Sequence, residues 1–496
     1  MKAPTVETGC GWIRGHRRRD VLRFDGIPFA EPPVGPLRFS APRPPTPWTG
    51  VRDATAPRPG ALQRPGPALG TRPIGAIDED CLHLNVVTPG LEGRRPVLVW
   101  IHGGGFVNGA ASDPIHGGER LVRDGDLVLV TFDYRLGILG FLHSEAGSNL
   151  GILDQLLALR WVRDEIGAFG GDPDRVTLFG ESAGALSILA LMAMPEADDC
   201  FAQAVFQSGA AVGTLTPEQA ARVRHQFADC IGSDDPAHWR SCSVEQLLDA
   251  QGEVATRIRR ETGSGAFRPV VDGTRLLGDG TFAVTRSAHR GRAMIFGTNA
   301  DEQRLFLDLR RRWSRDESAA RLAFGLRNRM DAPLDAAHQV LEALSRLHPE
   351  EPEAFRLARA ETDLYYRLPA LGYARRRCEA APTWNYLFSW ASPALRGRLG
   401  ACHALEIPFV FGTLDAPGMD RFAGSGPDAE ALSAEMIAAW SAFARGGDPA
   451  AAIGDWLPWD PQRRRTWLPG AATPITDAPQ EAQRAIWAAL LPEADF

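Results

Sequence analysis

Long apolar runs are missing from this sequence, and cysteine is scarce. No stretch approaches the ~20 consecutive apolar residues that a membrane-spanning helix needs, and the first residues lack the apolar core of a secretion signal. The seven cysteines are odd in number and widely scattered, which excludes a disulfide framework, and no cluster of cysteine and histidine has the spacing of a metal site. We therefore expect a soluble, cytoplasmic protein with reduced thiols, no metal and no membrane partner.

Positive charge is also in deficit. Lysine and arginine number 54 against 61 aspartates and glutamates, which gives a net charge of -7 and argues against a nucleic-acid partner. The remaining composition, 44% hydrophobic and 23% charged over 496 residues, is that of a globular protein with a large core. Large α/β enzymes often build a chain of this length around one sheet, so we expect a single domain over residues 1–496.

The sequence does contain a regular alternation of strands and helices. The expected strands lie within RPVLVWI, DLVLVTF, VTLFG, QAVFQ, RAMIFG and TWNYLF, and helix-like segments separate several of them. Strands that are apolar throughout and alternate with helices predict an α/β fold, with a large, mostly parallel sheet covered by helices on both faces. Residues 303–375 are mostly helix-like and charged, and we interpret them as a helical, cap-like insertion.

The segment VTLFGESAGALSI places Ser182 between two glycines, where a strand meets a helix. A G-x-S-x-G turn of this kind holds the serine in a strained backbone and exposes its Oγ, as a nucleophile requires. The alternative is a tight turn in which the serine only caps the helix. The pentapeptide is a weak signal by itself, so the partners of a nucleophile must be sought elsewhere in the chain.

A second motif, HGGGF at residues 102–106, ends a strand upstream of the serine. A glycine run at such a place can direct backbone N–H groups at a developing oxyanion, and the N–H of Ala183 would join them. The alternative is a flexible loop at the end of a strand. Two independent motifs in the right order favour the catalytic interpretation.

An orienting acid and a base are expected after later strands. RAMIFGTNADE delivers Asp301 and Glu302 to the end of a strand, although Asp301 also suits a helix N-cap. Three of the eleven histidines follow Glu302, namely His338, His348 and His403. The first two lie in helix-like, polar sequence, whereas His403 follows the strand TWNYLFSW by a loop. The resulting order of serine, acid and histidine is the one expected of an α/β-hydrolase.

The chain resembles the type-B carboxylesterases, a branch of the α/β-hydrolases. The matching stretches follow the family order from residue 24 to 412 and are FDGIPFAEPPVGPLRF, EDCLHLNVVTP, WIHGGGF, NLGILDQLLALRWVRDEIGAFGGDP, FGESAGALS, GTNADE and HALEIPFVFG. The resemblance implies a nucleophile, an acid and a base, which are Ser182, Glu302 rather than Asp301, and His403. It further implies helical insertions over the active site, oxyanion donors at Gly104, Gly105 and Ala183, and supporting residues at Glu181 and Ser187.

Two departures from the family bear on location and specificity. In secreted relatives the cysteine of the EDCL motif pairs with one shortly upstream, whereas here the nearest cysteine upstream of Cys81 is Cys10, in agreement with a cytoplasmic location. Residues 51–80 contain no aromatic side chain that would stack on choline. Phe106 and Leu186, which adjoin the two glycine motifs, are expected to favour an uncharged acyl group.

The expected reaction is hydrolysis of a small-molecule carboxylic ester in two acyl-transfer steps through an acyl-serine, without a cofactor. An amidase or carbamate hydrolase stays open as an alternative, because the pocket rather than the triad selects the leaving group. A non-catalytic, esterase-like binding module is a third interpretation, against which the complete set of serine, glutamate and histidine argues. The expected assembly is a monomer or a small homo-oligomer.

Overall fold

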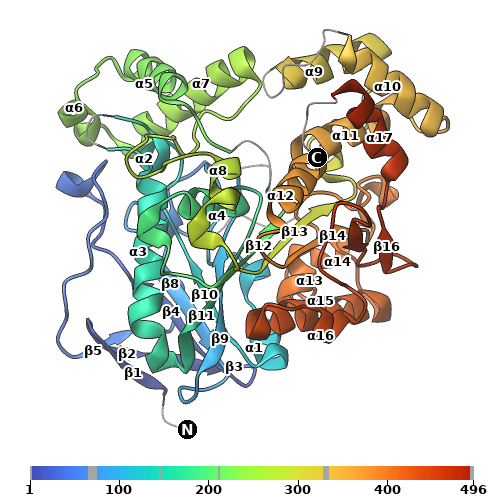
Figure 1. Ribbon diagram of the computed structural model, residues 1–496. Coiled ribbons are helices and arrows are strands. Elements are labelled where there is room, and N and C mark those ends of the chain that lie inside the picture. The colour runs from blue at the N-terminus through green and yellow to red at the C-terminus, as the bar shows by residue number, and fades with distance from the viewer. Residues whose placement is uncertain (1–2, 65–74, 145–146, 210–212, 328–334, 492–496) are drawn as a thin grey trace.

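A large sheet runs through the molecule (Figure 1). In the computed structural model, which describes residues 3–64, 75–144, 147–209, 213–327 and 335–491, this sheet has 11 strands in the order β16-β15-β14-β13-β12-β11-β9-β10-β8-β4-β3. The strands are β3 (His16–Arg18), β4 (Val21–Pro28), β8 (His83–Thr88), β9 (Arg95–Ile101), β10 (Val128–Phe132), β11 (Gly171–Glu181), β12 (Gln203–Gln207), β13 (Met294–Asn299), β14 (Thr383–Phe388), β15 (Arg465–Trp467) and β16 (Ile475–Asp477). Two small sheets contain β1 (Thr5–Thr8), β2 (Gly11–Arg14) and β5 (Val51–Asp53), and β6 (Gly60–Ala61) and β7 (Ile77–Asp78).

The centre of the large sheet is parallel. From β10 across β9, β11, β12, β13 and β14 to β15, each strand pairs with its neighbour in parallel. The outer strands β8, β4, β3 and β16 pair antiparallel. The strands expected from the sequence are β9 to β14, and their apolar character follows from burial on both faces. The predicted α/β fold with a mostly parallel sheet is confirmed.

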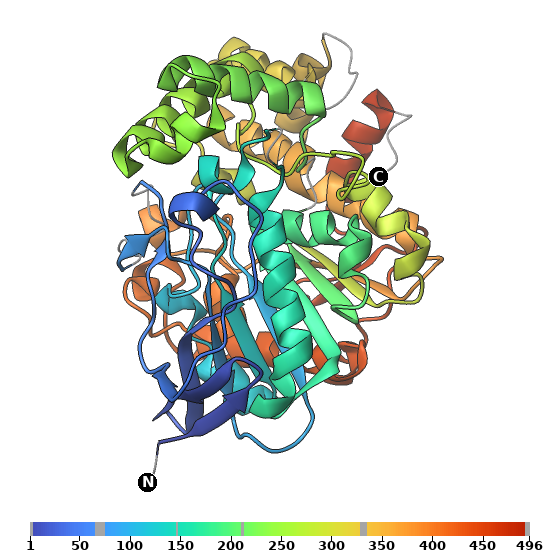
Figure 2. The same cartoon turned by 90° about the vertical axis from the view of Figure 1, so that its left-hand side faces the viewer.

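The side chains of β9 show how the two faces are covered. Because successive side chains of a strand point to opposite faces, Val97 and Val99 join one buried apolar cluster while Leu98 and Trp100 join another. The helices that fill these clusters are α3 (Leu150–Glu165) and α4 (Ala183–Met192) on the first side, and α13 (Ile407–Phe411) and α15 (Pro427–Gly446) on the second. In Figure 2 the teal and blue-green helices α3 and α4 lie in front of the sheet, and orange-red helices lie behind it.

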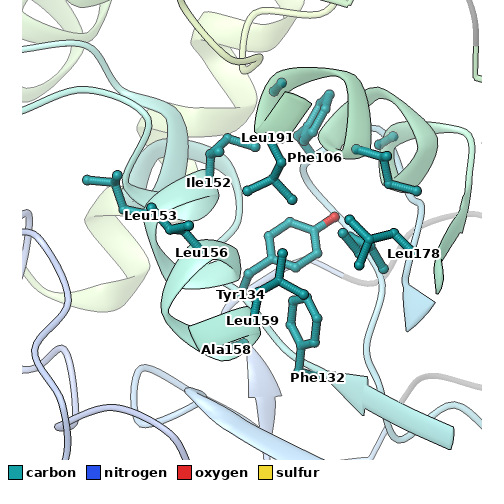
Figure 3. Packing of buried hydrophobic residues seen from close by; sticks show 14 of the residues in the cluster. Phe106, Phe132, Tyr134, Ile152, Leu153, Leu156, Ala158, Leu159, Leu178 and Leu191 are labelled. Atoms are coloured by element: carbon teal, nitrogen blue, oxygen red, sulfur yellow. The ribbon is translucent and has the colours of Figure 1, made fainter. Parts of the chain in front are cut away.

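The first cluster reaches the glycine run through Tyr134 (Figure 3). The Tyr134 ring packs beside Leu159 of α3, and its hydroxyl donates a hydrogen bond to the carbonyl of His102 at 2.9 Å. Phe106 belongs to this cluster too, with 1% of its surface exposed and its ring 4.8 Å from that of Phe141. The expectation that Phe106 faces the acyl group is therefore wrong, because burial in the core takes the apolar ring out of water.

Two groups of helices lie at the end of the molecule opposite the N-terminus (Figures 1 and 2). They are α5 (Pro217–Ile231), α6 (Pro236–Ser241) and α7 (Val244–Thr262), and α9 (Arg315–Arg327), α10 (Ala336–Leu347) and α11 (Glu353–Thr362). In the first group, Gln251 of α7 accepts a hydrogen bond at 2.9 Å from the N–H of Ile138 in α2 (Gly137–Phe141), just after β10. In the second, Thr362 accepts one at 3.2 Å from the N–H of Gln303 in the short 3-10 helix η6 (Glu302–Leu305), just after β13.

Each helical group is thus anchored on a loop at the carboxyl end of a parallel strand. The remaining helices include α1 (Glu119–Gly125), α8 (Gly280–Thr285), α12 (Leu368–Arg377), α14 (Met419–Phe422), α16 (Ala450–Ile453) and α17 (Glu481–Leu490). Among the helices that the structure describes, none combines the length and the apolar character needed to cross a membrane.

Candidate active site

Ser182 lies at the turn between β11 and α4 in a conformation that L-residues rarely adopt, with φ 54° and ψ -119°. Such strain persists only where the surroundings hold it. The two arms of the turn approach so closely that a Cβ at Gly180 would lie 2.7 Å from the carbonyl carbon of Gly184. The Ser182 side chain does not cap α4, so the capping alternative fails. Within the described residues its hydroxyl makes no hydrogen bond, and the residue is partly exposed.

The glycine run lies directly beside this serine. A Cβ placed on Gly103 would be 3.3 Å from the Cβ of Ser182. Gly104 and Gly105 are exposed, with φ values of 104° and 64°. Ala183 is the first residue of α4, where N–H groups have no partner inside the helix. In the part of the chain that the structure describes, the N–H groups of Gly104, Gly105 and Ala183 make no hydrogen bond, so they are open to an incoming oxygen.

Gln63 holds the far end of the glycine loop, a role that no sequence pattern indicated. Its side-chain amide accepts a hydrogen bond from the N–H of Gly109 at 3.0 Å and donates one to the carbonyl of the same residue at 2.9 Å. The loop also closes on itself, since the N–H groups of Val107 and Asn108 donate to the carbonyl of Gly104 at 3.2 and 3.0 Å. The segment from Gly104 to Gly109 is therefore a turn that hydrogen bonds hold at both ends.

The structure brings Glu302 and His403 together across 101 positions of sequence. His403 Nδ1 lies 2.6 Å from Glu302 Oε2, and the other oxygen of Glu302 accepts the N–H of Asn299 at 2.7 Å. Both side chains are buried. A carboxylate held in this way fixes the orientation of the imidazole and keeps the proton on Nδ1. By contrast, His338 is exposed on α10, where it lies 3.7 Å from Asp316.

Asp301, the other acid expected near the site, takes a different partner. It occupies the N-cap position of η6, but its side chain makes no capping hydrogen bond. Its Oδ2 instead accepts the N–H of Ala401 at 3.0 Å, and its own N–H donates to the carbonyl of Ala401 at 2.9 Å. The helix-cap interpretation is wrong, because the loop that carries His403 passes close enough to take the carboxylate.

Glu181 contacts the opposite side of the imidazole. Its Oε1 lies 2.9 Å from His403 Nε2, an ion-pair contact that lacks the alignment of a hydrogen bond. Burial opposes the positive charge of His403, yet the charges of Glu181, Tyr366 and Glu302 outweigh it and raise the pKa of His403 well above its ordinary value. The site therefore favours the protonated imidazole.

A third buried carboxyl group, Glu406, completes this cluster. Its oxygens accept hydrogen bonds from Asn299 Nδ2 at 2.6 Å and from Gln207 Nε2 at 3.1 Å. Burial, together with the charges of Glu181 and Glu302, raises the pKa of Glu406 to about 7. Burial likewise raises the pKa of Glu181. The pKa values of Glu181, Glu406 and His403 are thus all raised within one buried cluster.

Two aromatic rings pack against His403, and no sequence motif indicated either of them. The Phe306 ring centroid lies 5.1 Å from that of the imidazole, and the Tyr366 centroid lies 5.0 Å from it. Phe306 directly follows η6, and 52% of its surface is exposed. Tyr366 belongs to the π-helical turn Asp363–Arg367 between α11 and α12. The only sequence feature that could have pointed to either ring is the position of Phe306, four residues after Glu302.

Ser187 lies on the buried side of α4. Its hydroxyl accepts a hydrogen bond from Gln155 Nε2 of α3 at 3.0 Å. Within the described residues it makes no hydrogen bond to Glu302 or His403. Its contact therefore fastens α4 to α3, behind the turn that carries Ser182.

The strained serine, the open N–H groups beside it and the histidine fixed by a glutamate are the parts of a serine hydrolase with the α/β-hydrolase fold. The mostly parallel sheet, with the serine turn at the carboxyl end of a central strand, agrees with this class.

Comparison with known proteins extends this assignment. The profile of the Carboxylesterase family matches residues 2–487. Para-nitrobenzyl esterase of Bacillus subtilis (strain 168) is 38% identical over 501 residues, with 98% of each chain covered. Phenmedipham hydrolase of Pseudarthrobacter oxydans is 36% identical over 470 residues, with 90% of each chain covered.

Solved structures agree with the sequence comparison. A PNB esterase superposes with a TM-score of 0.86 at 35% identity, covering 98% of this chain and 99% of its own. A carboxylesterase of Geobacillus stearothermophilus superposes with a TM-score of 0.85 at 36% identity, covering 97% of this chain and 99% of its own. The chain belongs to the carboxylesterase family. It is a serine carboxylesterase that hydrolyses carboxylic esters through an acyl-serine.

Proposed function

We propose that Ser182 is the nucleophile, His403 the general base and Glu302 the acid that orients it. The observation that carries this proposal is the 2.6 Å contact between His403 Nδ1 and Glu302 Oε2, in a site whose serine has a strained backbone. His403 accepts the proton of Ser182 as Oγ attacks the ester carbonyl. The alcohol leaves with that proton, and an acyl-serine remains. Water, deprotonated by the same histidine, then releases the acid.

Proton transfer requires His403 Nε2 to turn from Glu181 toward Ser182. Glu181 directly precedes the serine in the chain, and the ring is proposed to turn from the carboxylate to the hydroxyl when substrate binds. Catalytic hydrogen bonds of unliganded enzymes are often long and tighten in the complex. The Glu181 carboxylate then stays close enough to stabilise the imidazolium that forms.

The N–H groups of Gly104, Gly105 and Ala183 bind the oxyanion of the tetrahedral intermediate. Removing one such donor typically costs about 2.7–4 kcal/mol of transition-state stabilisation. Ser187 supports this arrangement from behind, because it fixes the helix whose first N–H is a donor. Gln63 supports it from the other end of the glycine loop.

The proposed substrates are small, uncharged esters, aryl and benzyl esters among them. The support is the pair of rings beside His403 together with the likeness to para-nitrobenzyl esterase. The seven free thiols support a reducing, cytoplasmic location, and the negative net charge argues against nucleic acid. Because both helical groups are anchored on loops of one sheet, residues 1–496 are proposed to form one domain, in a monomer or a small homo-oligomer.

The Ser182→Ala variant tests the central assignment. We expect loss of para-nitrophenyl acetate hydrolysis and of covalent labelling by an organophosphate, because both require Oγ. Ser241→Ala, which changes an exposed serine at the end of α6, is the matched control and should keep both. Stoichiometric labelling of Ser182→Ala would show that another residue is the nucleophile.

A further inference from the structure

Asp301, the residue before the proposed acid, links the two loops that carry Glu302 and His403. Asp301 and Ala401 exchange two hydrogen bonds, one from the backbone N–H of Asp301 at 2.9 Å and one to its carboxylate Oδ2 at 3.0 Å. Ala401 stands two positions before His403, and Asp301 stands one before Glu302. The backbone N–H of His403 also approaches the carbonyl of Glu302, at 3.4 Å. The Asp301 side chain, these backbone hydrogen bonds and a 2.8 Å hydrogen bond from Asn299 Nδ2 to the Cys402 carbonyl therefore join the base loop, residues 400–403, to the acid loop, residues 299–302.

The base loop is shaped to receive this carboxylate. Gly400 has a φ of 58°, and a Cβ there would lie 2.2 Å from Asp301 Oδ2, so only glycine lets the chain pass so close. The carbonyl of Gly400 accepts the N–H of Ser392 at 2.9 Å, which holds the preceding turn. The backbone at residues 400–401 is thus shaped to accept the Asp301 carboxylate at close distance.

The guanidinium of Arg304, which is largely buried, forms an ion pair with the other carboxylate oxygen of Asp301. Arg304 Nη2 lies 3.0 Å from Oδ1, and only 10% of the arginine side chain and 15% of the aspartate side chain are exposed. The guanidinium also stacks over Phe355 of α11, 4.3 Å from the ring centroid. An ion pair that water reaches so little holds its geometry better than one on the surface. Arg304 thereby holds the Asp301 carboxylate turned toward the base loop.

We propose that Asp301 is a positioning residue, which holds His403 at hydrogen-bonding distance from Glu302 by fastening the loop before it. The inference rests on the proposed function of these two residues. It assigns to Asp301 no contact with substrate or reacting atoms. Small misplacements of catalytic groups are costly, since a shift of about 1 Å can lower a rate about a hundredfold.

Three variants and one control test this role. Asp301→Ala removes the acceptor for the Ala401 N–H, Asp301→Asn keeps an oxygen there but loses the charge, and Arg304→Met removes the cation. Asp316→Ala, which changes an aspartate side chain that is 95% exposed, is the control. Rates of para-nitrophenyl butyrate hydrolysis are divided by the concentration of sites that an organophosphate titrates, so that unfolded protein does not count.

For Asp301→Ala we expect kcat per titrated site to fall by at least about tenfold with KM changed by less than about twofold, because chemistry rather than binding is disturbed. The acid limb of its kcat/KM profile should also move to lower pH, since His403 would lose its close contact with Glu302 while Glu181 and Tyr366 still face it. For Asp301→Asn and Arg304→Met, kcat per titrated site should lie between the values for Asp301→Ala and the unaltered enzyme. For Asp316→Ala it should equal that of the unaltered enzyme.

A purely structural role gives a different pattern, in which Asp301→Ala lowers Tm and the number of titrated sites while kcat per site and the pH profile stay unchanged. That result would overturn the inference. Glu302→Gln distinguishes this failure from failure of the proposed function. If Glu302→Gln lowers kcat by orders of magnitude while Asp301→Ala does not, the catalytic assignment stands and the positioning role is wrong. If Glu302→Gln stays active while Asp301→Asn is inactive, the catalytic acid is Asp301 and both proposals fail.

Discussion

At the scale of single residues, the charge on His403 depends on groups that face it from several elements. Glu181 contributes from the end of β11, Glu302 from η6, and Tyr366 from the turn before α12. Two carboxylates on one imidazole stabilise the cation, whereas catalysis needs the neutral base. If His403 is the base, as proposed, the neighbours that stabilise its imidazolium also set a lower limit on the pH at which the enzyme works.

The pH profile of kcat/KM should show how strongly the neighbouring carboxylates favour the protonated form of His403. The sequence alone predicts a midpoint in the ordinary histidine range of ~6 to 7. Because the pKa of His403 is raised well above its ordinary value, we expect activity to fall on acidification with a midpoint above that range. Glu181→Gln should move the midpoint down, since it removes the charge 2.9 Å from Nε2. A profile that stays flat down to about pH 5 would contradict a histidine base.

At the scale of elements, the glycine loop, residues 103–109, is held by the side chain of Gln63, which lies outside the loop. The Gln63 amide satisfies both backbone groups of Gly109, and Asn108 turns the loop back onto Gly104. Donors aimed at an oxyanion contribute most when they need no rearrangement during the reaction. A loop clamped at its far end therefore preserves the direction of its free N–H groups.

Gln63→Leu should separate stability from catalysis in this loop. The N–H and carbonyl of Gly109 would lose their partners, and because these groups are partly buried the unfolding free energy should fall by about 1 kcal/mol. We expect kcat for para-nitrophenyl acetate to fall about tenfold or more, with a smaller change in KM, because the oxyanion donors loosen. Urea unfolding and steady-state kinetics on the same samples check both effects. An unchanged kcat in a destabilised variant would show that the glycine turn keeps its shape without the clamp.

Elements with a regular pattern were predictable, and those fixed by tertiary contacts were not. The strands β9 to β14 follow from continuous apolar runs, and the turn at Ser182 follows from its two glycines. Asp301 looked like a helix cap because local sequence cannot show that Ala401 passes beside it. The burial of Phe106 depends in the same way on Phe141, which lies on a later helix.

The site was predictable to the extent that motifs carry it. Glu302 and His403 follow from their place after strands and from the family resemblance, and the structure brings them together. Gln63 and Tyr366 lie in segments without a motif, so only the folded chain shows that they reach the site. The helical group α5 to α7 was also not singled out, because its amphipathic helices resemble those on any protein surface.

At the scale of the whole molecule, the surroundings of the base come from segments far apart in the chain. The turn at Ser182, Phe306 after β13 and Tyr366 after α11 meet only because one sheet and the second helical group hold them. Choline recognition was not expected, since residues 51–80 lack aromatic side chains, and residues 65–74 of that stretch lie outside the described residues. The aromatic surface next to the base comes instead from Phe306 and Tyr366.

These two rings should favour aryl esters over acetylcholine. An aryl group gains ring contacts of about 0.5–1.5 kcal/mol beyond the burial of its area, whereas a quaternary ammonium on a half-exposed ring gains only about 0.5–1 kcal/mol. The net charge of -7 attracts a cation over a distance, but salt screens that attraction. We expect kcat/KM for para-nitrophenyl butyrate to exceed that for acetylcholine by at least about tenfold at ~0.15 M salt, a factor that requires ~1.4 kcal/mol. The ring contacts supply at most about 1 kcal/mol of this difference, and burial of the aryl area, at about 25 cal/mol per Å², supplies the rest.

Phe306→Ala tests the source of this preference against a matched phenylalanine. Phe282 of α8 is 37% exposed, so Phe282→Ala removes a ring of comparable exposure on another element. Loss of a ring contact worth about 0.5–1.5 kcal/mol predicts that Phe306→Ala lowers kcat/KM for the aryl ester roughly 2- to 13-fold, while Phe282→Ala leaves it unchanged. Equal effects of the two variants would remove Phe306 from the substrate site. Hydrolysis of acetylcholine as fast as that of the aryl ester would show that the rings bind a cation better than their exposure implies, and that the site accepts charged alcohols.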